Sequence, residues 1–158
     1  MTTRLRVTKT HRAFRRWRIY PEPGRAGFFW IYLCRDRQTF LRVLKDTSII
    51  DPFPAGRSIN GLCQTWRHLR SRDGRWRAAP DLGAIIVHLG RIGAGVAAHE
   101  LMHATIGWAR RKRLNPRAVF DLRGRPAEST TNERLCSANE HLTRQFWNGF
   151  YRVTRRVA

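Results

Sequence analysis

Two histidines and a glutamate occur as His99-Glu100-Leu101-Met102-His103, an H-E-x-x-H pattern. If this segment is helical, the histidines are separated by about 400° of rotation and leave the same face one turn apart, where both imidazoles can bind one ion. Glu100 lies about 100° round from His99, so its carboxylate can take a proton from an activated water without being a ligand. The pattern predicts a zinc site formed by His99 and His103, with Glu100 as the general base.

The neighbours of the motif predict that its helix is buried. Val96, Met102 and Ile106 share the side of the histidines, and alanines, Leu101 and Trp108 occupy the other sides. A helix that is apolar all round is normally buried, and an unpaired carboxylate there costs several kcal/mol or becomes protonated. A bound divalent cation resolves this conflict, so we prefer a zinc site to a surface helix that happens to carry two histidines.

A zinc site needs at least a third protein ligand. The extended metzincin pattern requires Gly at position 106 and His at position 109, where this chain has Ile106 and Ala109, so that class is excluded. The downstream candidates are Glu128, Glu133, Glu140 and His141.

Glu133 and Glu140 lie seven residues apart on one ridge of a later helix, only about 20° apart in rotation, and either is able to face the metal helix. We rank Glu133 first, Glu140 second and His141 third. Two other roles stay open. Glu133 can close a capping box with Thr130. Glu140 can be an exposed carboxylate or a hydrogen-bond partner of a ligating histidine.

The elements that must position these residues begin with strands. Aromatic and β-branched residues predict a strand pair over Ala13–Tyr20 and Phe28–Cys34, joined by a Pro-Gly turn. Leu62–Leu69 is a further candidate strand, and Leu82–Leu89 is the clearest one. Thr39–Lys45 is more typical of a helix, because its apolar residues fall on one side.

Two long helices follow the strands. Val96–Arg113 contains no proline, has a basic last turn and stops before Asn115-Pro116. Ser129–Phe150 carries an apolar stripe and is expected to return antiparallel beside it. The order predicts an α+β domain over residues 1–158, with a small N-terminal mixed or antiparallel sheet followed by two long helices.

The chain carries 31 Lys and Arg against 11 Asp and Glu, a formal charge of +20. Such a charge attracts polyanions, so nucleic acid is a possible partner, but spread arginines are equally typical of a solvated surface. Phe14–Arg18, Trp66–Arg67 and Arg75–Arg77 interleave arginine with aromatics, as nucleic-acid surfaces do; in strands the same pattern more often separates core and solvent faces.

Several protein classes are excluded or disfavoured. The longest apolar run, Phe28–Cys34, is too short to cross a bilayer, and the N-terminus lacks a secretory signal, so no membrane partner is expected. Cys34, Cys63 and Cys136 are odd in number and form no C-x-x-C, which favours neither a disulfide framework nor a thiolate zinc site. We expect a reducing cytoplasm, and Cys136 is expected to pack between helices.

The segment AAHELMHATIGWAR, preceded by GAIIVHL and followed by NERLCSANEHLTRQFW, resembles a compact gluzincin-type zinc metallopeptidase. It is similar to minimal HExxH proteins of phages and integrated elements, and more distantly to the ImmA/IrrE and SprT-like groups. The resemblance spans Leu82 to Phe150 and implies a zincin-like fold with His99, His103 and Glu133 as zinc ligands and Glu100 as the base. It also implies that the strand Leu82–Leu89 is the edge that pairs with an extended peptide substrate.

Three functions from different classes follow. The first is a zinc-dependent metallopeptidase that hydrolyses protein or peptide substrates. The second is an arginine-rich nucleic-acid-binding accessory protein with a structural or vestigial zinc site. The third combines them, as a protease recruited to DNA-bound proteins.

Overall fold

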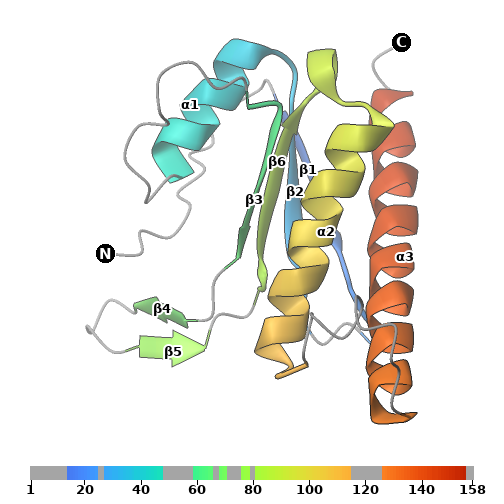
Figure 1. Ribbon diagram of the computed structural model, residues 1–158. Coiled ribbons are helices and arrows are strands. Elements are labelled where there is room, and N and C mark those ends of the chain that lie inside the picture. The colour runs from blue at the N-terminus through green and yellow to red at the C-terminus, as the bar shows by residue number, and fades with distance from the viewer. Residues whose placement is uncertain are drawn as a thin grey trace.

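The chain forms three layers, in which a β-sheet lies between a short helix on one face and two long helices on the other (Figure 1). The computed structural model describes residues 14–24, 27–47, 59–65, 68–70, 76–78, 81–114 and 126–155. The elements are β1 (Phe14–Ile19), β2 (Phe29–Cys34), α1 (Arg37–Thr47), β3 (Gly61–Thr65), β4 (His68–Arg70), β5 (Trp76–Ala78), β6 (Gly83–His88), the 3-10 turn η1 (Leu89–Arg91), α2 (Ala94–Arg111) and α3 (Pro126–Thr154).

The main sheet has four strands in the order β1-β2-β6-β3. β2 and β6 are parallel, whereas β1 and β3 run antiparallel to their neighbours. The predicted α+β class is therefore confirmed, as a mixed sheet followed by two long helices. The expected strand pair is also confirmed as β1 and β2, joined through the turn at Pro21–Gly24, where Gly24 adopts a positive φ of 88°.

The expectation that the strand around Leu82–Leu89 is a sheet edge is wrong. β6 pairs with β2 on one side and with β3 on the other, so the outer strands of this sheet, among the described residues, are β1 and β3. All residues of β6 are buried, because both faces of the strand are covered by helices. An apolar run without alternation is typical of such a central strand.

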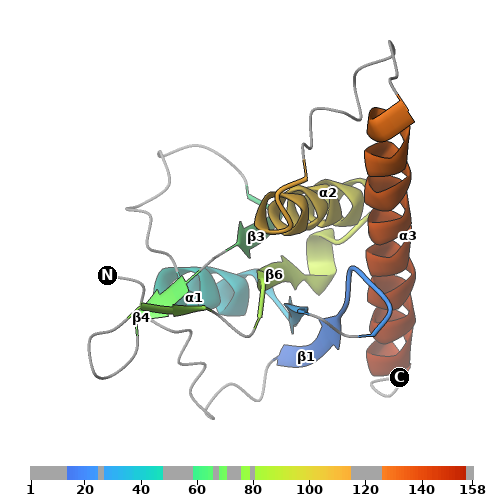
Figure 2. The same cartoon turned by 90° about the horizontal axis from the view of Figure 1, so that it is seen from below.

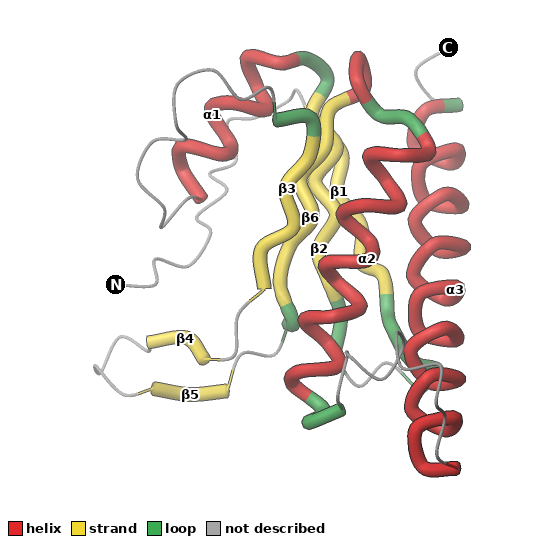
Figure 3. The backbone as a smooth tube through the Cα atoms, viewed as in Figure 1, coloured by secondary structure: helices red, strands yellow, loops and turns green. Residues whose placement is uncertain are grey.

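The candidate strand Leu62–Leu69 is divided between two sheets. Its first half belongs to β3, and its second half contributes to β4, which pairs with β5 in a separate two-stranded sheet (Figure 3). The sequence reasoning missed this second sheet. Both of its strands are three residues long, too short to show an alternating pattern.

Alternation along the strands produces two apolar cores. Trp17, Ile31 and Ile85 face α2 and α3, where they join buried residues of both helices. Tyr32 and Ile86 face the opposite side and pack with Phe40 of α1. Figure 2 shows these layers end on, with α1 separated from α2 and α3 by the sheet. A mixed sheet buried on two faces needs this double set of apolar residues.

The helices differ from their predicted bounds at the ends. α1 is longer than Thr39–Lys45, because the Asp36 carboxylate accepts a hydrogen bond from the Thr39 backbone N–H (2.8 Å) and caps the first turn. α2 covers Ala94–Arg111 in place of Val96–Arg113, since Arg113 adopts a left-handed φ of 58°. None of the described helices combines the length and apolarity that crossing a bilayer requires.

α3 begins at Pro126, a residue suited to the first position of a helix, and runs antiparallel to α2 as expected (Figure 1). Glu133 therefore lies well inside the helix, and its expected capping box with Thr130 is not at the N-terminus. The Thr105 hydroxyl joins the two helices through a hydrogen bond to the Asn139 side chain (3.2 Å).

Candidate metal centre

The predicted H-E-x-x-H motif lies in the first half of α2, and this helix is buried on one side only. Its buried face carries Glu100 and the residues that pack on the sheet and α3, whereas His99, Met102 and His103 are exposed. The expectation of all-round burial is thus wrong. α2 belongs to an outer layer, so the far side of the helix meets solvent although several of its residues are apolar.

The two histidines are placed together. His99 Nε2 and His103 Nε2 are 3.1 Å apart, and their rings are nearly perpendicular at 83°. Two nitrogens bound to one tetrahedral zinc ion at its usual bond length are about 3.3 Å apart. The separation therefore fits a shared ion without rearrangement of the helix. Both imidazoles are exposed, which leaves room for further ligands.

Glu100 lies at the boundary between α2 and β3, where its charge still interacts with those of His99 and His103. It is 6% exposed, and a Cβ built on Gly61 of β3 would lie 3.0 Å from Glu100 Cγ. Burial raises the pKa of Glu100, and this outweighs the lowering by His99, His103 and a backbone hydrogen bond from Cys63. The carboxylate thus has an increased proton affinity, as a general base near neutral pH requires.

Among the described residues, the strand beside Glu100 is an edge of the four-stranded sheet, because β3 pairs there with β6 alone. α2 lies lengthwise against it (Figure 1): Gly61 contacts Val96 and Glu100, and Gly107 lies against Thr65. Sequence reasoning missed β3 as part of the site. The two glycines, which permit this close approach, are the signal that could have indicated it.

The Thr105–Asn139 contact is a reference point for the positions of the candidate third ligands along the axes of α2 and α3. With a rise of about 1.5 Å per residue, Glu133 lies about 9 Å from this contact toward the C-terminal end of α2. His103 lies about 3 Å from it in the opposite direction, at nearly the level of Glu140. Both carboxylates are exposed. In the part of the chain that the structure describes, no three His, Cys, Asp or Glu residues are arranged to hold a metal ion.

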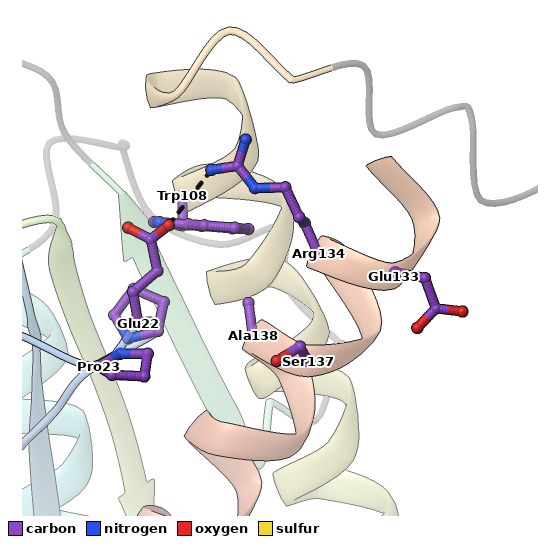
Figure 4. A pocket seen from close by; sticks show the side chains of 8 residues that line it. Glu22, Pro23, Trp108, Glu133, Arg134, Ser137 and Ala138 are labelled. Carbon is purple, nitrogen blue, oxygen red and sulfur yellow. Dashed lines mark hydrogen bonds and ion pairs between the residues drawn. The ribbon is translucent and has the colours of Figure 1, made fainter. Parts of the chain in front are cut away.

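Glu133 borders a different feature, an open pocket of about 570 Å³ at the C-terminal end of α2 (Figure 4). Glu22 lies in this pocket and forms ion pairs with Lys112 (2.9 Å) and Arg134 (3.3 Å). Burial raises the pKa of the Glu22 carboxyl. The ion pairs with Lys112 and Arg134 lower it by more, so the net shift of this pKa is downward. The Glu133 side chain points away from the pocket interior.

The remaining candidates lie elsewhere. His141 Nδ1 is 2.9 Å from Arg144 Nη2 on α3, and the side chain of Glu128 lies outside the described residues. His88 is buried, and its ring centre lies 5.2 Å from that of Phe40, so this histidine packs in the core. Cys136 is exposed, so its expected place between helices is wrong.

The arginine-aromatic pattern of Phe14–Arg18 follows the faces of β1. Trp17 is buried in the core, and Arg16 and Arg18 are exposed on the opposite face. The alternation expected for a strand is thus confirmed here. Trp66–Arg67 and the side chains of Arg75–Arg77 lie outside the described residues.

Comparisons with models of known protein families, with curated proteins and with solved structures each gave no match for this chain. The gluzincin resemblance therefore stays a prediction, and the function has to be argued from the residues and their geometry.

Proposed function

We propose that this chain is a zinc-dependent metallopeptidase with a zincin-like fold, in which His99 and His103 hold the ion and Glu100 is the general base. The observation that carries the proposal is the 3.1 Å separation of the two Nε2 atoms on the exposed face of α2, one residue from a buried carboxylate. A pair of histidines for the metal and an adjacent carboxylate for the proton are the parts that water-driven amide hydrolysis requires.

A zinc ion bound here would polarise the scissile carbonyl and make the attacking water more acidic. Glu100 accepts the proton of that water and delivers it to the leaving amine.

The free edge of β3 supports an extended peptide as substrate. An added strand would use backbone groups of β3 other than the Cys63 N–H, which donates to Glu100, as in other β-augmentation complexes. β3 contacts Glu100 through Gly61, so a peptide paired there would pass beside the base. We assign this role to β3 because β6, the strand implied by the resemblance, is paired on both sides.

The exposed histidines favour a catalytic zinc site over the structural site of the accessory-protein hypothesis. Structural zinc is closed by a full set of protein ligands, whereas a catalytic ion keeps an open position. The described residues around His99 and His103 supply an open, solvent-facing pair. Of Glu133 and Glu140, the two candidates on α3 whose side chains the structure describes, we propose Glu140 as the further ligand, because it lies near the level of His103.

The test compares Glu100→Gln with Glu22→Gln, a matched change of a half-buried carboxylate outside the site. Zinc content is measured after purification, and hydrolysis is followed with an unfolded protein substrate. We expect Glu100→Gln to keep zinc and lose at least about 100-fold in activity, since the amide cannot accept the proton. Glu22→Gln should retain both properties. Wild-type protein that binds zinc and hydrolyses no peptide, or that binds no zinc, would refute the proposal.

A further inference from the structure

The outer face of β1 and β2 carries a ladder of arginine and aromatic side chains. Register places Arg18 opposite Trp30 and Arg16 opposite Tyr32, and the same face continues through Phe28 at the start of β2. α1 packs on the β6 and β2 part of this face, where it buries Tyr32 and Cys34. Figure 2 shows α1 beside β6, and the helix contacts β6 and β2.

The arginines stack on the rings of the neighbouring strand. The Arg18 guanidinium carbon lies 4.7 Å from the ring centres of both Phe28 and Trp30, and that of Arg16 lies 5.2 Å from Trp30. Both arginines are exposed, and both rings are half-buried. Flat guanidinium groups are thus held over aromatic rings, with their other side turned to solvent.

The described residues give these arginines no ion-pair partner. Neither Arg16 nor Arg18 belongs to the ion pairs found among the described residues, which join Glu22 to Lys112 and Arg134 on the other side of the sheet. Arg16 donates a hydrogen bond to the Tyr32 hydroxyl, and Asp81 is the carboxylate whose charge acts on Tyr32. The chain as a whole carries a formal charge of +20. The ladder is therefore complementary to a polyanion with flat, stackable groups.

We propose that this ladder, formed by Arg16, Arg18, Phe28 and Trp30, binds single-stranded nucleic acid. Unpaired bases stack on arginine planes and aromatic rings, while the guanidinium edges donate to phosphate oxygens. A duplex is the poorer ligand, because its bases are already stacked and offer the ladder only their phosphates. The proposal is independent of the peptidase, since the ladder lies on the face of the sheet opposite to α2.

The experiment measures binding of fluorescent oligo-dT and oligo-U of about 20 nucleotides by anisotropy, at salt concentrations between about 50 and 200 mM. Arg16→Gln/Arg18→Gln is compared with Arg144→Gln/Arg152→Gln, which removes the same charge from exposed positions of α3. We expect the ladder variant to bind at least about 10-fold more weakly and to reduce the salt slope by about 1.4, the value for two lost phosphate contacts on a single strand. The control variant should change affinity by less than about 3-fold.

Trp30→Leu tests stacking separately from charge. We expect a loss of about 5- to 100-fold with an unchanged salt slope, because stacking is not an ionic contact. Circular dichroism verifies that the variant is folded. Equal losses in the two arginine variants, no binding at low salt, or tighter binding of a duplex than of either single strand would each overturn the proposal. Preference between oligo-dT and oligo-U then identifies the natural strand as DNA or RNA.

Discussion

Replacement of Gly61 by alanine tests whether the packing of β3 on α2 sets the position of the general base. The added Cβ would lie 3.0 Å from both Glu100 Cγ and Val96 Cγ1, and 3.3 Å from Glu100 Oε1. Ordinary contacts of this kind are 3.4–4 Å long, so the two side chains or the strand must move by a few tenths of an ångström. Gly61 has no positive φ, and alanine therefore adds this contact without backbone strain.

The displacement acts on the reaction more than on the metal. A shift of about 1 Å in a catalytic group can cost up to about 100-fold in rate, so we expect Gly61→Ala to lower kcat/KM by about 10-fold, or about 1.4 kcal/mol in activation free energy. Zinc affinity should change by less than about 3-fold, because His99 and His103 lie on the exposed face of α2. Overpacking also costs about 1–3 kcal/mol of folding stability, partly offset by the lower chain entropy of alanine.

The assay needs three readouts: peptide hydrolysis, zinc competition with a chromophoric chelator, and urea unfolding. Gly95→Ala is the control. Gly95 lies on α2, the helix that carries Glu100, but a Cβ built there meets nothing within 4 Å. It should keep full activity. If Gly61→Ala were as active as Gly95→Ala, the contact between β3 and Glu100 would not position the base. If it lost zinc and activity together, Glu100 would be a metal ligand and not the base.

Three further changes have expected outcomes. Glu140→Gln should weaken zinc binding by about 10-fold or more and Glu133→Gln by less, in a chelator competition; the reverse order would restore the sequence ranking. Burial, and then Arg37 and Arg91, lower the pKa of His88 below 6.5, so protonation of the unfolded chain should reduce stability as the pH falls below that value. His88→Leu should diminish this loss between about pH 7.5 and 5 in urea unfolding, and an identical loss would contradict it. Gly149→Ala should destabilise the protein by about 1–3 kcal/mol, because its Cβ would overlap the Trp17 ring; unchanged unfolding would show that α3 can move away from β1.

The elements that the sequence predicted best are those whose pattern is local. Aromatic strands and a repeating apolar stripe are set by neighbouring residues, and β1, β2, β6, α2 and α3 all lie within a few residues of their expected bounds. Strand order is a long-range property. The resemblance placed the strand Leu82–Leu89 at an edge, although its continuous apolar run already favoured a strand covered on both faces.

The site was predictable to the extent that one helix contains it. Spacing alone places His99 and His103 on one face and turns Glu100 away from them. Which face of α2 meets solvent depends on what packs against the helix. The apolar composition of α2 predicted burial on all sides, but Met102 is 46% exposed. A third ligand on another helix depends on the relative height of α2 and α3, which the intervening sequence does not encode in its spacing.

Three contacts fix the position of α3 along the axis of α2. Together they restrict which residue of α3 can bind the metal. At the C-terminal end of α2, Glu22 joins Lys112 to Arg134 of α3. In the middle Thr105 bonds to Asn139, and near the other end Gly149 seats α3 against Trp17 of β1. A slide of α3 by the two turns that would bring Glu133 to His103, about 11 Å, would break all three contacts at once. Rotation of one exposed Glu140 side chain about its own bonds breaks none of them, which is why the framework favours Glu140 if α3 supplies the ligand.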